Sequence, residues 1–594
     1  MGRLVWLAAL AATLVRADDI AWWPTSHRPD PFGEVVAADR GESRGKPKIA
    51  GLQAARAGYV SAQVVVSLDR PRPYHVEFRL DDPSGKLQID VFREWFHFTD
   101  WAKAYYPDAL VPIQHPYDSS LPEADNNIPK QSAQAFWVDV WVPADTPPGD
   151  YTLRAVLRTG SRGRRETRLK VKVTDLLTPP EDAVTIDHNA YGSTFLAEQY
   201  PRLAANYLDG NFFSSDDFFR LIHAYHRIFY EHRGTFHQLG YGHGGKVGPE
   251  FAPALEGHGR KRHVSSWDLF DRHYAQLLDG TAFKDTRRGA KPIPFMYLPV
   301  NPEWPACFVN WGEPGYKAEF TQVLGEIEEH FRQNNWVNTS LEVFFNHKKR
   351  YKAFPWDGDE IRFTEDFPFY QEFGQLLKAA TPPDSPVKFL VRADVSWAME
   401  QEMETLKGAV GMWVAAGSVL SWLPDAPAKA HQRGELLWHY SGPPPVTQPA
   451  VSAAKQPLRT WIWRADGYVH WLTVNPGSDP WFHFDGGGTT LVYPGDRFGL
   501  RDPIPSIRLK NQRNVLQDLA LLQSLRINRA EVTVAFNDSQ PGDWWSPRPE
   551  RADRPPNEWN NPDLEAASRA ADAQVENIDP DAWNRVRALI FEKK

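Results

Sequence analysis

A short acidic segment is the strongest candidate for chemistry in this sequence. Residues 355–360 read Pro-Trp-Asp-Gly-Asp-Glu. Consecutive residues of a strand point to opposite faces, so Asp359 and Glu360 can share a site only on a loop or turn. Pro355 and Gly358 favour such a loop.

Two neighbouring carboxyl groups suit the hydrolysis of a glycosidic bond. One carboxylic acid protonates the leaving oxygen, and a second group serves the anomeric centre. Proximity of two carboxylates raises the pKa of one of them, which suits a general acid at neutral pH. A solvated acidic loop or a calcium site are the alternatives, although the segment lacks the further acids and the glycine of an EF-hand.

The elements after residue 183 predict an α/β barrel that would position this segment. Apolar strand-like runs alternate with helical stretches, and this eightfold alternation is typical of a (β/α)8 TIM barrel over residues 181–530. A doubly wound open sheet is the alternative, but no glycine-rich loop follows the first run. The runs are 184–188, 235–239, 293–300, 341–345, 387–392, 411–415, 436–440 and 468–474. The helical stretches are 215–232, 316–333, 367–380, 397–406 and 508–525.

In a TIM barrel the active site lies where the strands end. Polar and aromatic residues gather at or after these ends, and we expect them to share one face. A lone histidine or asparagine there is more often a loop hydrogen-bond partner, so the enrichment over many strand ends carries the prediction. The candidate substrate-binding residues are Asn346, Lys348, Trp356, Arg392, Asp394, Trp413, Trp438, His439, Tyr440, His470 and Trp471.

The composition narrows the range of functions. The net charge of −8 does not favour a polyanion, so no nucleic-acid partner is expected. The 24 tryptophans either stack on sugars or fill cores. We predict that at least two of five tryptophans line a cleft beside Glu360. These are Trp304, Trp356, Trp413, Trp438 and Trp471.

Other catalytic motifs are missing from the sequence. It contains no Gly-x-Ser-x-Gly elbow, no P-loop and no His-Glu-x-x-His motif. No cofactor and no metal site is therefore expected. A metal-dependent hydrolase would need three or more His or Asp ligands that converge at the barrel mouth.

The two ends of the chain differ from the barrel. Residues 1–17 have a charged start and a short apolar run, which predicts a signal peptide and a secreted or periplasmic protein with no further membrane segment. Short alternating strands, such as 61–67 and 135–142, predict a β-sandwich over residues 18–180. Residues 531–594 are expected to form a tail with a terminal helix near 580–592.

Several motifs resemble glycoside hydrolase family 123 and its uncharacterised relatives. The N-terminal motif runs from Gln134 to Pro143 and continues at 148–151 with Pro-Gly-Asp-Tyr. The barrel motifs are Leu436–Tyr440, Arg459–Trp463, Gly467–Trp471, Leu491–Gly495 and Pro503–Asp518. Together they span most of the chain.

This resemblance implies an exo-acting, retaining β-N-acetylgalactosaminidase whose substrate's own 2-acetamido oxygen attacks the anomeric carbon. Glu360 would be the general acid/base, and Asp359 would hold the acetamido group. Ile361 stands where the family usually has proline, and Asn346-His-Lys348 resembles an Asn-x-Lys motif of some relatives. The alternatives are a non-catalytic carbohydrate-binding surface protein on the same scaffold and a glycosidase that acts on a different sugar.

Overall fold

A computed structural model of the chain separates it into two compact units. The first comprises residues up to 96, with 105–107 and 112–175, and the second comprises 97–104, 108–111 and 176–594. The structure describes residues 18–41, 46–160, 163–192, 194–208, 211–239, 250–299, 304–306, 314–345, 356, 358–361, 364–396, 399–474, 479–484, 489–548, 566, 569–570 and 578–592. The predicted signal peptide lies outside these residues. Within them, no helix is both long and apolar enough to cross a membrane.

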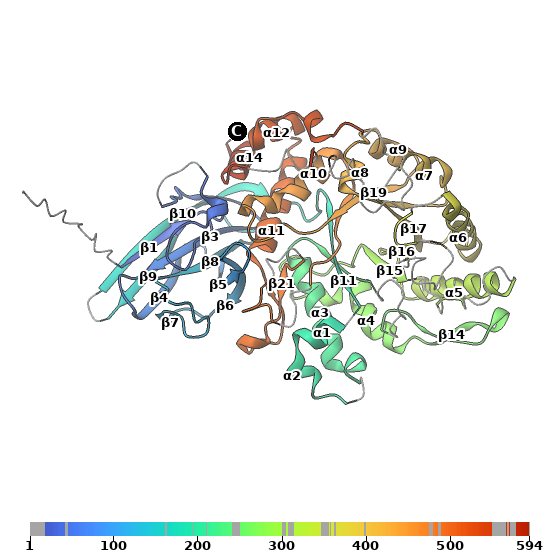
Figure 1. Cartoon of the computed structure of the whole chain (residues 1–594), viewed down its shortest axis with the longest axis horizontal. Helices are drawn as coiled ribbons and strands as arrows, with labels where there is room; N and C mark the ends of the chain where they lie inside the picture. Colours follow the sequence, from blue (N-terminus) through green and yellow to red (C-terminus); the bar gives the residue numbers. More distant parts are fainter. Residues whose placement is uncertain are drawn as a thin grey trace, which may run out of the picture. The chain divides into compact units, whose positions relative to one another are not determined.

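The strands before residue 178 form two five-stranded sheets among the described residues (Figure 1). One has the order β1-β3-β8-β5-β6 and the other β2-β10-β9-β4-β7. Neighbours such as β3 and β8, or β4 and β9, are antiparallel. The strands are β1 Asp19–Trp23, β2 Leu52–Arg56, β3 Gly58–Ser67, β4 Arg72–Asp81, β5 Gln88–Thr99, β6 Ala104–Pro112, β7 Tyr117–Leu121, β8 Ala133–Val142, β9 Gly149–Thr159 and β10 Gly163–Leu177.

Alternating apolar residues of both sheets meet in one hydrophobic core. Val64 and Val138 come from the first sheet, and Val76 and Leu153 come from the second. Successive strand residues point to opposite faces, so every second residue of these strands enters the core. Two antiparallel sheets therefore share a single buried layer.

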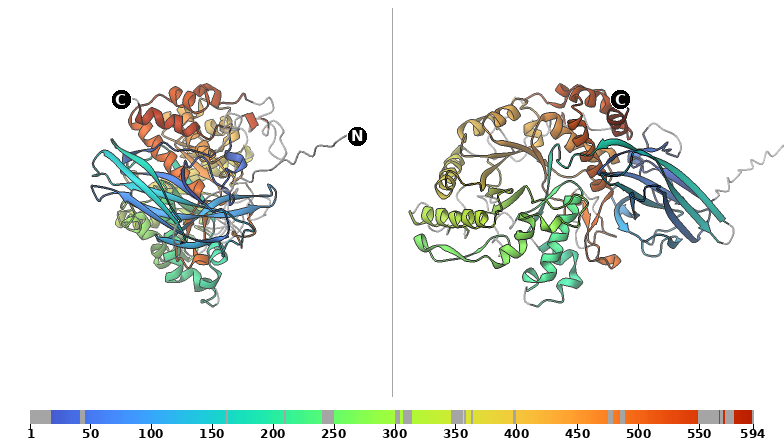
Figure 2. Two further views of the ribbon diagram at one scale, coloured as in Figure 1. Left: turned by 90° about the vertical axis from the view of Figure 1, so that its left-hand side faces the viewer. Right: turned by 180° about the vertical axis from the view of Figure 1, so that it is seen from behind.

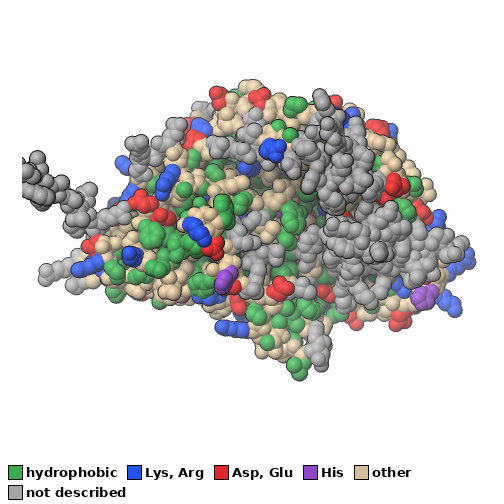
Figure 3. All heavy atoms as spheres, viewed as in Figure 1, with side chains coloured by type: hydrophobic (Ala, Val, Ile, Leu, Met, Phe, Trp, Pro, Cys, Tyr) green, Lys and Arg blue, Asp and Glu red, His purple; other side chains and the backbone are tan. Residues whose placement is uncertain are grey.

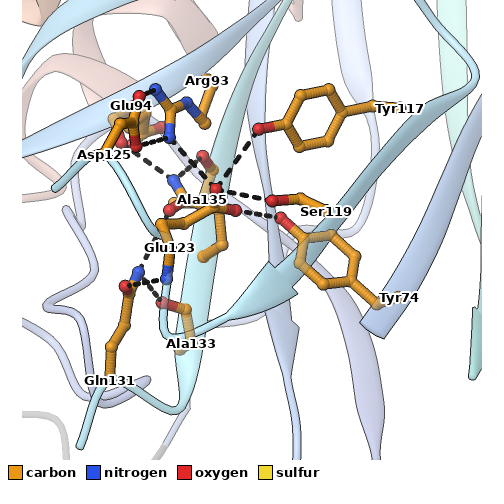
Figure 4. A network of polar contacts seen from close by, with 11 residues as sticks. Tyr74, Arg93, Glu94, Tyr117, Ser119, Glu123, Asp125, Gln131, Ala133 and Ala135 are labelled. Carbon is orange, nitrogen blue, oxygen red and sulfur yellow. Dashed lines mark hydrogen bonds and ion pairs between the residues drawn. The ribbon is translucent and has the colours of Figure 1, made fainter. Parts of the chain in front are cut away.

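A buried polar network ties several strands of the first unit together (Figure 4). The carboxylate of Glu123 accepts hydrogen bonds from Tyr74 at 2.6 Å, Ser119 at 2.7 Å and Arg93 at 3.2 Å. The Glu123 backbone N–H donates to the Gln131 side chain at 2.9 Å. Because these partners satisfy the buried carboxylate, the network is a structural feature of the sheets.

The second unit contains eight parallel strands in the order β12-β11-β20-β19-β18-β17-β16-β15. Each of the eight predicted runs corresponds to one of them. Helices lie along the outer side of these strands when the molecule is seen from behind (Figure 2). The strands are β11 Thr185–Tyr191, β12 Thr235–Leu239, β15 Phe295–Pro299, β16 Ser340–Phe344, β17 Lys388–Val395, β18 Met412–Ala416, β19 Leu436–Ser441 and β20 Gly467–His470.

The ring of strands is nearly closed. The first and last strands pair, with Thr185 beside Gly467. The seam lies between β12 and β15, which are the two ends of the strand order. There the rings of His237 and Tyr297 pack with centroids 4.4 Å apart. Side-chain packing thus covers the seam, whereas the sequence predicted a fully closed barrel.

Local sequence signals explain where the main helices begin. Ser215 and Ser506 cap α3 and α11 by accepting hydrogen bonds from the backbone N–H of Phe218 and Leu509. Pro368 lies in the first turn of α6, where its missing N–H has no helical partner to lose. The helices are α1 Thr194–Gln199, α2 Pro201–Ala204, α3 Asp216–Glu231, α4 Asp268–Leu278, α5 Pro314–Gln333, α6 Phe367–Ala380, α7 Glu400–Thr405, α8 Gly417–Leu420, α9 Ala426–Gln432, α10 Lys455–Trp463, α11 Ile507–Ser524, α12 Arg529–Asn537 and α14 Ala582–Phe591.

Smaller elements complete the second unit. The terminal helix α14 docks on α11, because Trp583 and Arg587 both bond the Asp518 carboxylate at 2.8 Å. On the face shown in Figure 3, acidic and basic side chains of the described residues are interspersed. Two short antiparallel pairs lie outside the barrel, β13 Ala254–Glu256 with β14 His263–Ser266 and β21 Val492–Tyr493 with β22 Ile504–Pro505.

Candidate active site

The segment with the acidic pair is held on both sides. On one side Trp356 is fully buried, and its ring stacks on Phe369 with centroids 5.0 Å apart. The hydroxyl of Tyr370 donates to the Gly358 carbonyl at 3.1 Å. On the other side the Ile361 N–H donates to the Asp394 carbonyl at 2.8 Å. Asp359 and Glu360 therefore lie beside the carboxyl end of β17, where a barrel enzyme carries its site.

Tyr440 joins this group from the carboxyl end of β19. Its hydroxyl donates a hydrogen bond to Oε1 of Glu360. Burial and the nearby carboxylates of Glu360, Asp394 and Asp359 hold the pKa of Tyr440 well above its ordinary value. The hydroxyl therefore stays protonated and remains a donor. Asp359 and Glu360 are both half-buried.

Asp394 brings a third carboxyl group to the site. Both of its oxygens accept hydrogen bonds from Arg392, at 2.7 Å from Nε and 2.9 Å from Nη2. Burial, together with the charges of Asp359 and Glu360, raises the pKa of Asp394 to about 7 against the opposing effect of Arg392. A carboxyl group of the site thus titrates near neutral pH.

A buried polar layer inside the barrel supports Arg392. Its Nη1 donates to the Tyr297 hydroxyl at 2.6 Å and to Glu342 at 3.1 Å. In the same layer Nδ1 of His237 lies 2.8 Å from Asp187. Burial opposes the charged form of His237, but the carboxylates of Asp187 and Glu342 outweigh it and raise the His237 pKa. The layer fixes Arg392 and, through it, Asp394.

Burial of four of the five tryptophans contradicts the prediction that at least two of them line a cleft beside Glu360. Trp304, Trp356, Trp413 and Trp438 are buried, so they are not sugar platforms. Trp413 points out of the barrel and donates to Glu435 at 2.9 Å. Trp438 fills the barrel interior over Gly467, where an added Cβ would come within 2.4 Å of the ring.

Two predicted histidines also face away from the acidic pair. His439 bonds Thr460 of α10 at 2.8 Å, and His470 bonds Gln512 of α11 at 3.1 Å. The residue before each histidine, Trp438 or Val469, points into the barrel. Because successive strand residues point to opposite faces, both histidines point outward and are buried between the strands and the surrounding helices. Burial lowers the pKa of His439 well below its ordinary value and that of His470 to about 3, so both are neutral.

The remaining predicted residues divide into two groups. Arg392, Asp394, Tyr440 and the acidic pair lie together, and Trp471 follows the end of β20 with 39% of its surface exposed. Asn346 and Lys348 lie outside the described residues. Among the residues that the structure does describe, no group of three His, Cys, Asp or Glu side chains is placed to hold a metal ion.

Sequence reasoning missed the supporting layer of Asp187, Tyr297 and Glu342. A usable signal was present for Glu342, which is a charged residue within the apolar run at 341–345. A charged residue within such a strand must reach a polar partner. These three residues lie in the middle of their strands, away from the strand ends where a barrel site is expected.

Comparison with known proteins supports this fold. No known family profile and no curated protein matches the chain. The structure is similar to a family 123 glycoside hydrolase from Clostridium perfringens, studied for glycolipid glycan hydrolysis, with a TM-score of 0.63 and 12% identity over 97% of this chain and 100% of that chain. A Bacteroides ovatus GH5 xyloglucanase has a TM-score of 0.28 and 9% identity over 80% of this chain and 98% of that chain, which is too weak for any argument. The first likeness shows a shared two-part fold of a parallel barrel and a β domain.

Proposed function

We propose that this protein is a glycoside hydrolase whose acidic pair performs the chemistry. One observation carries the proposal: Glu360 accepts a hydrogen bond from Tyr440 beside Asp394, at the carboxyl end of the barrel. An acid held by a fixed donor among other carboxyl groups is suited to proton transfer. The similar fold of the family 123 enzyme supports the same reaction class.

The finer proposal is an exo-acting, retaining β-N-acetylhexosaminidase of the galactosaminidase type. The substrate's acetamido oxygen forms a bond to the anomeric carbon while the glycosidic carbon–oxygen bond breaks. Glu360 gives its proton to the leaving oxygen, and then takes a proton from the water that opens the cyclic intermediate. Asp359 accepts a hydrogen bond from the acetamido N–H, which strengthens as positive charge develops.

Other parts of the chain have roles consistent with this function. Trp471 is exposed, so its indole can stack on a sugar ring. Asn346 and Lys348, which resemble an Asn-x-Lys motif of some family 123 relatives, are proposed to bind the substrate. We further propose that the N-terminal unit is a β-sandwich, supported by its two antiparallel sheets around one core. Export through a signal peptide at residues 1–17 completes the proposal.

The function is tested with a panel of chromogenic sugars. The purified protein is offered 4-nitrophenyl β-N-acetylgalactosaminide, the N-acetylglucosaminide and the matching 2-hydroxy hexosides. We expect turnover of an acetamido sugar and little turnover of its 2-hydroxy analogue. The Asp359→Asn variant should lose acetamido turnover whatever the leaving group, whereas the exposed Glu329→Gln variant on α5 should match the wild type.

Three results would change the assignment. Equal hydrolysis of acetamido and 2-hydroxy sugars would exclude substrate assistance and leave a glycosidase of another mechanism. Sugar binding without any turnover would favour a carbohydrate-binding protein. Wild-type rates in Asp359→Asn and Glu360→Gln would make the pair a structural acidic loop.

A further inference from the structure

The hairpin of β13 and β14 carries a dense positive charge at its tip. Five of the seven residues at 257–263 are Arg, Lys or His, and the nearest acidic residues along the chain are Glu256 and Asp268. The whole chain, by contrast, has a net charge of −8. Basic side chains gather at the right-hand edge of Figure 3, where Figure 1 places β14. We call these residues the basic tip: His258, Arg260, Lys261, Arg262 and His263.

Local backbone geometry fixes the shape of the basic tip. β13 and β14 are antiparallel, and a single 3-10 turn at Gly259–Lys261 lies between them. Gly257 has a φ of +76°, and an added Cβ there would come within 2.1 Å of the Lys261 carbonyl oxygen. This tight turn therefore requires glycine. The Arg262 guanidinium donates to the Gly257 carbonyl at 3.1 Å, so this one side chain stabilises the turn itself.

Helix α5 holds the hairpin in place. The Val264 N–H donates to the Glu326 carboxylate at 2.7 Å, and the Gly259 N–H donates to the Glu319 carboxylate. These two carboxylates lie about two turns apart on α5, so the hairpin follows the helix toward its first turns. The basic tip is therefore fixed before any partner arrives, which lowers the entropy cost of binding.

The chain order places the basic tip on the side of the barrel where substrates bind. β13 and β14 lie between β12 and α4, so they belong to a connection that leaves the carboxyl end of a strand. In a barrel enzyme such connections surround the active site. The tip contacts Glu319 near the start of α5, and this helix likewise follows the carboxyl end of its strand, β15.

Two side chains of the basic tip are available to a partner. Arg260 and Lys261 are exposed, and neither forms an ion pair with any residue that the structure describes. The acid nearest in the hairpin, Glu256, lies opposite His263 on the neighbouring strand. A guanidinium and an ammonium group bind the oxygens of sulfate and carboxylate groups through charge-assisted hydrogen bonds.

Given the glycosidase function proposed above, we propose that the basic tip binds an acidic glycan chain. Its contacts are the sulfate or carboxylate groups of the sugars that follow the terminal sugar removed by the enzyme. The substrate class is then an acidic glycan that ends in a β-N-acetylhexosamine. Because the contact lies away from the reacting atoms, it contributes to binding and to the rate of encounter, and not to the chemical step.

Binding is measured with a fluorescently labelled chondroitin sulfate octasaccharide and with a neutral oligomer of β-linked N-acetylglucosamine. The wild-type protein should prefer the sulfated chain in low salt and lose this preference in high salt, because counterions screen exposed charges. The double substitution Arg260→Ser and Lys261→Ser should weaken binding of the sulfated chain about tenfold. The control, Lys407→Ser with Lys429→Ser, removes the same charge from two other exposed positions and should bind like the wild type.

Kinetics with the same variants separate binding from chemistry. On a chondroitin oligosaccharide that ends in β-N-acetylgalactosamine, the Arg260→Ser and Lys261→Ser variant should raise KM about tenfold and keep the wild-type kcat. It should hydrolyse a 4-nitrophenyl sugar at the wild-type rate, because that substrate carries no acidic chain.

Three results would overturn the proposal. The first is equal binding of the sulfated and the neutral chain by the wild-type protein in low salt. The second is equal binding of the sulfated chain by the two double variants. The third is binding of phosphatidylserine vesicles or duplex DNA that matches the sulfated chain and depends equally on the tip, which would define a lipid or a general polyanion site instead.

The binding assay requires no turnover, so this proposal and the proposed function can fail separately. If the sulfated chain binds through the basic tip but no sugar is hydrolysed, the glycosidase function fails and the glycan-binding site stands. If the nitrophenyl sugar is hydrolysed while the Arg260→Ser and Lys261→Ser variant binds the sulfated chain like the wild type, the basic tip is refuted and the glycosidase function stands.

Discussion

Removal of the Tyr440 hydroxyl should shift the pH dependence of the proposed glycosidase activity upward. The substitution Tyr440→Phe deletes the donor to Glu360 and retains a ring that packs with the apolar cluster inside the barrel. Because burial and neighbouring carboxylates raise the Tyr440 pKa, the hydroxyl donates throughout the working pH range. It therefore favours the ionised form of Glu360 over the acid form.

The size of the shift follows from that single contact. A hydrogen bond to a charged group contributes about 1.5–3 kcal/mol. One pH unit corresponds to about 1.4 kcal/mol, so the alkaline limb of kcat/KM should rise by about 1–2 pH units.

The assay is a kcat/KM profile on an unactivated acetamido sugar, with melting temperatures measured in parallel. Tyr230→Phe is the matched control, because it deletes a hydroxyl of α3 that donates to the Gly289 carbonyl at 2.8 Å. The control should leave the profile in place. An unmoved or lowered limb in Tyr440→Phe, with normal stability, would refute the assigned role of this contact.

Two further predictions concern stability. Trp356→Ala should lower the free energy of unfolding by about 3–5 kcal/mol. It should also reduce kcat/KM more than Trp463→Ala does, because Trp463 is equally buried but does not contact the acidic segment. Unfolding free energies and kcat/KM are measured for both variants. Equal losses of kcat/KM in the two variants would argue against a role of Trp356 in holding the acidic segment. Glu94 is buried and its pKa is raised to about 8, so its stabilising effect is present below about pH 4.5 and is lost as pH rises through 8. Glu94→Gln should remove up to about 5 kcal/mol of this pH dependence between pH 5 and 9, measured by urea unfolding, and an unchanged dependence would contradict it.

The barrel could be predicted because its strands and helices carry local signals. The run at 235–239 and the helix at 367–380 have the same limits in the structure as in the sequence prediction. Apolar runs of five to eight residues that alternate with helices leave few other folds. The seam at His237 and Tyr297 could not be predicted, because it depends on side chains from two strands that are far apart in the chain.

The site was harder to predict than the fold. Strand alternation alone indicates that the His439 side chain points out of the barrel, because Trp438 and Tyr440 on either side of it point into the barrel. The tryptophan count could not separate sugar platforms from core residues, and Trp356 shows why: the same ring that suits a sugar also anchors a loop. The contact between Ile361 and Asp394 is non-local, and no sequence signal indicates it.

The most direct test of the central claim is the leaving-group dependence of Glu360→Gln. The variant and the wild type are compared on a 4-nitrophenyl and an alkyl β-N-acetylgalactosaminide, with Glu329→Gln as the control. If Glu360 is the general acid, the alkyl substrate should lose about 10²–10⁴ in turnover, and the nitrophenyl substrate, whose leaving group needs no proton, should lose far less. Equal losses on both substrates, or wild-type turnover on both, would contradict the account.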